Sequence, residues 1–221
     1  MTASQFKRIG MYKILSILLS YPRQEWLMHT EELSDAVNRL ATAEQTAALK
    51  PFFAHLRAHD EISLQEVYVD TFDRSRSHAL HLFEHLHGED RARGQAMVDL
   101  LTEYQSRGLE PENNELPDYL PLFLEFLSSI DPQEAENLLA DAVHVIGYIA
   151  ENLHKSQSVY APVMDAVVAL SPVAPKPLQA APVRNMDEAL EKFGPTTEGL
   201  EPLLNQPSVQ EVQFFRNKKL S

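Results

Sequence analysis

His81, Glu84 and His85 have the spacing of a zinc site, because they fit the pattern H-x-x-E-H of inverted zinc peptidases. In such a site the two histidines lie one helical turn apart and bind the metal, while the glutamate activates a water molecule. A third ligand could be Glu89 or Glu103. Histidine is frequent in this part of the chain, so the alternative is a polar helix start with solvated or core-bonded histidines. We keep a zinc metallopeptidase only as an alternative, and we expect no catalytic residue, no metal and no cofactor.

Acidic residues are concentrated in one part of the chain. Between residues 103 and 141 there are ten acidic residues and a single basic one, Arg107, in a protein whose net charge is −13. Such a run ordinarily forms a solubilising outer face. Here the acidic residues flank the segment 119–130, whose apolar side chains cover nearly the whole circumference of a helix. An apolar floor with an acidic rim suits a basic amphipathic helix, which is the helix-in-groove mode of peptide capture.

Acidic and basic residues alternate between positions 70 and 99, from Asp70 and Arg74 to Arg93 and Asp99. Isolated exposed ion pairs add little to stability, and networks of them mainly fix geometry. Intramolecular pairs that tie two helices together therefore explain most of this alternation, and contacts with a partner are left as the alternative.

The composition excludes several functions. With no cysteine, the chain has no disulfide, thiolate zinc site, iron–sulfur ligand set or thiol nucleophile. The negative net charge disfavours nucleic acid as a partner, because nucleic-acid binding depends on Lys and Arg side chains that neutralise phosphates. The sequence has no Ser-His-Asp order, phosphate-binding glycine loop or dinucleotide fingerprint. We therefore expect a protein that binds another protein and catalyses no reaction.

The first apolar stretch, residues 7–19, could be mistaken for a signal peptide because two basic residues precede it. Lys13 interrupts the stretch, however, and Tyr21 and Pro22 stand where a cleavage site would have small residues. Nothing else approaches the roughly 20 apolar residues of a membrane span. We expect a cytoplasmic protein without direct membrane insertion.

The elements that position these residues are predicted to be helices throughout. Apolar residues recur at helical spacing along most of the chain, and prolines mark the ends of several segments. We expect a compact all-α, bundle-like domain over residues 1–171. The predicted helices cover residues 4–21, 24–40, 43–58, 63–74, 91–107, 119–130, 132–153 and 159–170.

Three helix starts carry local signals. Ser63 with Glu66 three residues later forms a capping-box pattern. Asp118 can cap the apolar helix, and Asp131 precedes a proline in the preferred order for a cap. Each of these side chains is expected to accept a hydrogen bond from a free backbone N–H of its helix.

The composition and the apolar pattern of the end of the chain differ from those of the rest. Four prolines between residues 172 and 183 favour extended polyproline geometry, so this segment is predicted to be a linker. Residues 184–221 have only weak amphipathic pieces, and we expect a weakly helical or disordered tail.

Three stretches of the sequence match motifs of a known family. They are residues 72–76 (FDRSR), 82–101 (LFEHLHGEDRARGQAMVDLL) and 115–122 (ELPDYLPL). Together they closely resemble the nitrate reductase delta subunit (NarJ) family of molybdenum cofactor assembly chaperones. The third stretch is also similar to the E-x-P-D-H signature of the wider redox-enzyme maturation chaperones. Ser75 stands where the family often has Gly, and Tyr119 stands where the wider signature has His.

The resemblance implies an all-α fold and a chaperone for the apo catalytic (alpha) subunit of a membrane-bound respiratory nitrate reductase. It implies binding chiefly to the N-terminal segment of that subunit, support of molybdenum cofactor insertion, and a delay of docking to the membrane anchor. The chaperone would not be part of the final enzyme. Molybdenum cofactor biosynthesis proteins are a further class of partner that the resemblance admits. A generic helical protein-binding adaptor is the alternative that the residues alone leave open.

We place a peptide groove between the helices that start at Ser63, Arg91 and Asp118. The residues that line it are predicted from apolar spacing, from charge and from the matching stretches, and some of the apolar ones are expected to belong to the core. The apolar anchors are Tyr68, Phe83, Leu120, Phe123 and Leu127, the acidic rim is Asp73, Glu84, Glu89, Asp99, Glu115 and Asp118, and the further partner-binding residues are Arg74, Arg76, His87, Arg91, Pro117 and Tyr119.

Overall fold

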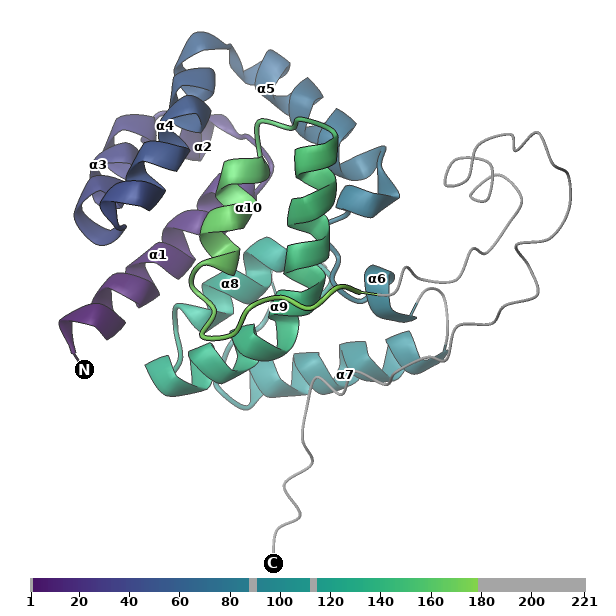
Figure 1. Cartoon of the computed structure of the whole chain (residues 1–221). Coiled ribbons are helices and arrows are strands. Elements are labelled where there is room, and N and C mark those ends of the chain that lie inside the picture. Colours follow the sequence, from purple (N-terminus) through teal and green to yellow (C-terminus); the bar gives the residue numbers. More distant parts are fainter. Residues whose placement is uncertain (1, 88–90, 112–114, 179–221) are drawn as a thin grey trace, which may run out of the picture.

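The chain folds into an all-α domain, as predicted (Figure 1). The computed structural model describes residues 2–87, 91–111 and 115–178, without the side chains of His87, Arg91 and Ala92, and the predicted tail over 184–221 lies outside these residues. In the described part no strand is formed, although His81 and Tyr119 make an isolated antiparallel bridge. None of the described helices is long and apolar enough to cross a membrane. The elements are α1 (Ala3–Leu19), α2 (Gln24–Leu27), α3 (Thr30–Leu40), α4 (Ala43–Ala58), α5 (Glu61–Tyr68), the π-helix η1 (Val69–Asp73), the 3₁₀-helix η2 (Arg76–His78), α6 (Glu84–His87), α7 (Arg91–Gln105), α8 (Leu120–Leu127), α9 (Pro132–Lys155) and α10 (Ala161–Val168).

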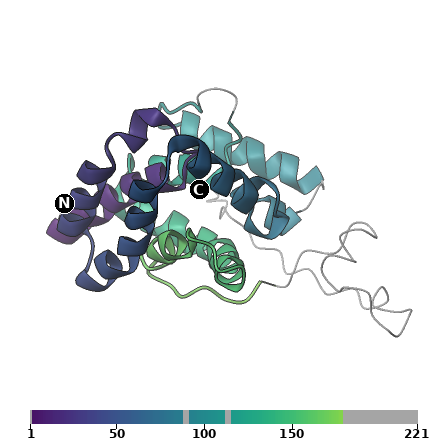
Figure 2. The ribbon, with the colours of Figure 1, turned by 90° about the horizontal axis from the view of Figure 1, so that it is seen from above.

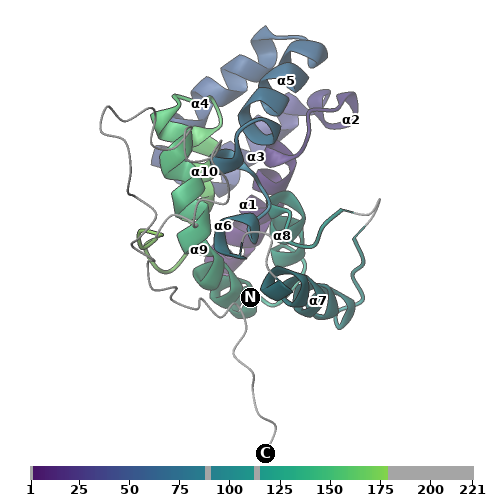
Figure 3. The same ribbon diagram turned by 90° about the vertical axis from the view of Figure 1, so that its right-hand side faces the viewer.

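Helix α1 runs through the centre of the domain. It lies between α8 on one side and the antiparallel pair α9 and α10 on the other, as Figure 3 shows. Figure 2 shows the two helices of this pair nearly end-on beside each other. Met11, Leu15 and Leu18 of α1 are fully buried, as their helical spacing predicted. Burial of one such side chain contributes about 1.5–3 kcal/mol to stability, so α1 holds the two sides of the domain together.

An aromatic cluster joins α4, α5 and η1 to the start of α10. The ring of Tyr160 lies 5.2 Å from that of Phe52 and 4.8 Å from that of Phe72, measured between centroids. Tyr68 lies 4.9 Å from Phe72 and, on its other side, 5.4 Å from Tyr21. These separations are in the range of favourable aromatic pairs, and the cluster therefore reaches the chain segment that follows α1.

The helix starts confirm one of the three predicted caps and correct the others. The Asp131 carboxylate accepts hydrogen bonds from two N–H groups of α9, as predicted. The capping box at Ser63 is wrong, because α5 begins two residues earlier and Asp60 accepts the Ser63 N–H at 2.8 Å. The predicted helix 24–40 is two helices, since residues 28 and 29 form a turn between α2 and α3. No side chain caps α8, so the prediction for Asp118 is also wrong.

The segment after α10 lies along α9 although it has no regular secondary structure. We call this segment, residues 171–178, the strap, and it crosses α9 in Figure 1. A Cβ atom at Gly147 would lie only 2.4 Å from the Cβ of Pro175, so α9 has a glycine where the strap crosses it. The Lys176 N–H also donates a hydrogen bond to His144 Nδ1 at 3.0 Å. The described part of the predicted linker is therefore attached to the domain.

Replacing Gly147 by Ala should release the strap. Alanine in a helix interior is favoured over glycine by about 0.5–1 kcal/mol, but its Cβ would collide with Pro175. We expect the Lys176 amide to exchange with deuterated water about tenfold faster in Gly147→Ala, because its bond to His144 is lost. Gly94→Ala is the control, since no atom lies within 4 Å of the added Cβ there. Equal exchange at Lys176 in all three proteins would show that the contact at Gly147 does not hold the strap.

Candidate partner-binding groove

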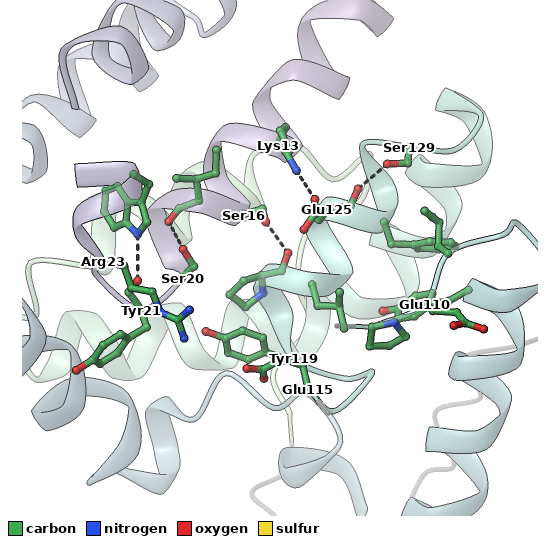
Figure 4. Close-up of a pocket in the computed structure, with 18 residues that line it drawn as sticks. Lys13, Ser16, Ser20, Tyr21, Arg23, Glu110, Glu115, Tyr119, Glu125 and Ser129 are labelled. Atoms are coloured by element: carbon green, nitrogen blue, oxygen red, sulfur yellow. Dashed lines mark hydrogen bonds and ion pairs between the residues drawn. The ribbon is translucent and has the colours of Figure 1, made fainter. Parts of the chain in front are cut away.

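A groove of about 530 Å³ opens between α1 and α8 (Figure 4). One wall comes from the second half of α1 and from the segment that follows it. The other wall comes from the loop after α7 and from α8. The groove is lined by Lys13, Ser16, Ile17, Ser20, Tyr21, Arg23, Trp26, Tyr104, Leu109, Glu110, Pro111, Glu115, Tyr119, Pro121, Leu122, Glu125, Phe126 and Ser129.

The half-buried apolar side chains that line the groove include Ile17, Trp26 and Leu122. The indole N–H of Trp26 donates to the Tyr21 carbonyl at 3.0 Å, which fixes the ring in the wall (Figure 4). On the floor, the buried Ser16 hydroxyl donates to the Pro121 carbonyl at 2.7 Å. This bond links α1 to the first turn of α8. The groove is therefore set by a direct contact between its two walls.

Most of the ten acidic residues between positions 103 and 141 have a partner inside the domain. Glu112 lies outside the described residues. Glu110 and Glu115 are exposed on the groove wall, and neither pairs with a basic side chain of the described residues. The acidic character of the groove therefore comes from these two carboxylates. The partnered acids include Glu103 and Glu134 on Arg107, Glu125 on Lys13, Glu136 on Arg8, Asp131 as the cap of α9, and the buried Asp118.

Asp118 is fully buried and joins two distant segments of the chain. Its carboxylate accepts a hydrogen bond from the Phe83 N–H at 3.0 Å and contacts Nδ1 of His81 at 3.2 Å. Two backbone hydrogen bonds of 2.8 and 3.0 Å join the same segments beside it. A buried backbone N–H must have a partner, and this carboxylate supplies one. In this conformation Asp118 is therefore not accessible to a partner, contrary to its predicted place on the acidic rim.

Tyr119 is held by a second tyrosine. Its hydroxyl lies 2.8 Å from the Tyr68 hydroxyl, which donates to the Leu19 carbonyl at 3.0 Å. Burial raises the pKa of Tyr119 to about 12, although the hydrogen bond with Tyr68 acts in the opposite direction. The phenol is therefore neutral near pH 7, and this position does not titrate as the histidine of the wider signature would.

The histidine pattern does not have the predicted metal-site geometry. Helix α6 begins at Glu84, so His81 lies before the helix and not one turn from His85. Nδ1 of His81 contacts the Asp118 carboxylate, Nε2 of His85 bonds a backbone carbonyl at 2.8 Å, and Glu84 pairs with Arg93. Among the described residues, no three His, Asp or Glu side chains gather closely enough to hold a metal ion. The fold gives the zinc metallopeptidase alternative no support.

The five predicted apolar anchors are core residues in this conformation. Each is at most 4% exposed. Apolar spacing along one helix does not show which other helix will cover it, and here α1 packs along α8, which carries Leu120, Phe123 and Leu127. The corrected residues are Tyr68, Phe83, Leu120, Phe123 and Leu127.

The predicted polar residues are spread over several parts of the molecule, and of this set Glu115 and Tyr119 line the groove. Pro117 is buried, and its carbonyl accepts the Tyr104 hydroxyl at 2.7 Å. Two ion pairs form within the molecule, Arg74 with Asp70 and Glu84 with Arg93, and they agree with the interpretation of the alternating charges as intramolecular pairs. Elsewhere Asp73 and Arg76 are exposed on η1 and η2, Asp99 is exposed on α7, and Glu89 and the side chains of His87 and Arg91 lie outside the described residues.

The structure is that of an all-α protein with an open groove between α1 and α8, and comparison with known proteins identifies its family. The family model of the nitrate reductase delta subunit matches residues 32–166. The chain therefore belongs to the nitrate reductase delta subunit family, as its motifs predicted.

Three relatives show how far the similarity extends. The chain is 35% identical to the nitrate reductase molybdenum cofactor assembly chaperone NarJ of Escherichia coli K12, over 93% of this chain and 85% of the relative. It is 36% identical to the probable chaperone NarW of the same organism, over 72% and 67% of the two chains. It is 30% identical to the probable chaperone NarJ of Bacillus subtilis 168, over 72% and 86%. The similarity to the first relative thus extends well beyond the residues that the family model matches.

His81 should make the stability of the domain depend on pH. Burial lowers the pKa of His81, but the hydrogen bond and the charge of Asp118 outweigh it, so the folded-state pKa is raised above the usual value of about 6.5. The stability from the protonated ring is complete below about pH 6.5 and is lost as the pH rises through the folded-state pKa. His81→Gln should remove this loss when urea unfolding of both proteins is compared from about pH 6 to pH 9. Parallel pH profiles of the two proteins would contradict the assignment.

Proposed function

We propose that this chain is an assembly chaperone for a respiratory nitrate reductase. It binds the apo catalytic (alpha) subunit, its client, through the N-terminal segment of that subunit. Binding supports molybdenum cofactor insertion and delays docking to the membrane anchor until the client is mature. The chain acts in the cytoplasm, catalyses no reaction and is absent from the final enzyme. The printed names of its relatives, which are nitrate reductase molybdenum cofactor assembly chaperones, support the proposal.

The main support for the proposal is that a member of this family has a groove between α1 and α8. Its volume of about 530 Å³ is in the range of ligand pockets, and it is partly lined by apolar side chains. Trp26 and Leu122 can receive the apolar face of a short helix. Glu110 and Glu115 have no basic partner among the described residues and can receive Lys or Arg side chains at its edge.

The two unpaired carboxylates give a direct test of peptide capture. The double variant Glu110→Lys and Glu115→Lys should bind the N-terminal peptide of the catalytic subunit about tenfold more weakly at low salt, because attraction becomes repulsion. The difference should shrink at about 1 M salt, where charges are screened within about 3 Å. Titration calorimetry at both salt concentrations measures this. Asp118 is left unchanged because it is buried.

The matched control is the double variant Glu44→Lys and Glu151→Lys, which makes the same change of charge on exposed residues of α4 and α9 away from the groove. It should bind the peptide almost as the wild type does. Equal weakening in both double variants would mean that net charge matters and that the groove carboxylates do not.

Co-purification tests the function itself. The chain should retain the catalytic subunit from cells that make it, and deletion of the N-terminal segment of that subunit should remove most of the retention. A generic helical adaptor would show no preference for this subunit. Retention of the shortened subunit at full strength would contradict binding through the N-terminal segment.

A further inference from the structure

The sequence contains a second candidate for the groove, within the chain itself. Residues 212–221 have the sequence VQFFRNKKLS, and we call them the tail segment. Its apolar residues are followed by three basic ones, and it has no acidic residue, in a protein whose net charge is −13. The apolar residues that begin it are Val212, Phe214 and Phe215, and the basic residues are Arg216, Lys218 and Lys219.

We propose that the tail segment binds in the groove between α1 and α8 and thereby competes with the client. The competition rests on the proposed function, whereas the binding of the tail segment does not. Its aromatic side chains contact the apolar lining at Trp26 and Leu122, and its basic side chains lie near Glu110 and Glu115. The chain thus carries an internal ligand with the same chemistry as a basic amphipathic peptide.

Charge complementarity favours this occupant. Of the five charged residues that line the groove, Lys13 and Glu125 pair with each other. Arg23, Glu110 and Glu115 are left, so the lining has an excess of one negative charge. A ligand with three bases and no acid neutralises both free carboxylates, and an acidic stretch of this chain would be repelled. Among residues 179–221, the bases are clustered without acids in the tail segment.

The length of chain between the strap and the tail segment allows this contact. The strap ends at Leu178, which packs against the core, so the remaining chain starts from a fixed point on the domain. An extended chain spans up to about 3.3 Å per residue, so residues 179–211 reach over about 100 Å. A domain of this size is about 40 Å across. The connection can therefore follow the surface to the groove from any starting point.

A tethered ligand needs little affinity to occupy its site. A ligand tethered to its own site can reach an effective concentration on the order of 1 mM. If the tail segment binds with a Kd of about 0.1–0.3 mM, the groove is mostly occupied and the client binds roughly fourfold to tenfold more weakly. A client with micromolar or better affinity still displaces it, so the tail segment keeps the apolar groove covered until a client is present.

Trp26 provides the readout, because it is the single tryptophan of the chain and lines the groove. The full-length triple variant Arg216→Glu, Lys218→Glu and Lys219→Glu should show a different Trp26 emission from the wild type. A synthetic peptide of residues 212–221, added to this variant, should restore the wild-type emission in a saturable manner. The control triple variant Lys7→Glu, Arg39→Glu and Lys50→Glu changes three exposed bases outside the groove and should behave as the wild type does.

Two results would overturn binding of the tail segment to its own groove. One is identical Trp26 emission in the wild type and the first triple variant, with no saturable response to the peptide. The other is an emission difference that grows with protein concentration, because this would place the tail segment on a second copy of the chain.

Titration with the N-terminal peptide of the catalytic subunit then tests the competition. The first triple variant should bind this peptide roughly fourfold to tenfold more tightly than the wild type. Equal affinity would overturn the competition while leaving the proposed function intact. Binding of the 212–221 peptide without any binding of the client peptide would contradict the proposed function and still support the tail segment as a ligand of the groove.

Discussion

The buried carboxylate of Asp118 fixes the position of the chain just before α8, and α8 forms part of one wall of the groove. A buried charge is costly unless hydrogen bonds satisfy it, and here the partners are the Phe83 N–H, 35 positions away, and the ring of His81. The next residue, Tyr119, is then held by Tyr68, and the Pro121 carbonyl by Ser16 of α1. These contacts follow one another along the chain and set α8 against α1. The groove is the space that this arrangement leaves open.

The sequence predicted most of the fold and a smaller part of the site. Helical periodicity and prolines located the long helices, and the apolar stripe of α1 was correctly assigned to the core. Local sequence signals predicted the wrong helix caps where contacts with distant residues determine the hydrogen bonds. Ser63 has a capping pattern, but Asp60 takes the cap, and Asp118 bonds a distant backbone N–H in place of its own helix. A single sequence does not show such partners.

Glu115 was predicted on the rim of a groove between the helices that start at Ser63, Arg91 and Asp118. In the structure it is exposed and lines a different groove, between α1 and α8. The three predicted anchors on α8, Leu120, Phe123 and Leu127, are buried in the core, because a helix that is apolar all round gives no indication of which side is covered. Ile17 and Trp26 were missed, since they precede the motifs that match the family and meet α8 only in the fold. One wall of the groove thus lies before the residues that the family model matches, and the other lies within them.

We propose that the groove between α1 and α8 receives the leading segment of the catalytic subunit. Photo-crosslinking from the groove itself tests it most directly, with a photoreactive amino acid at Leu122, which lines the groove, or at Val98, which is exposed on α7. We expect the probe at position 122 to crosslink to the N-terminal segment of the bound catalytic subunit and the probe at position 98 not to do so. A crosslink from position 98 alone, with none from position 122, would contradict it.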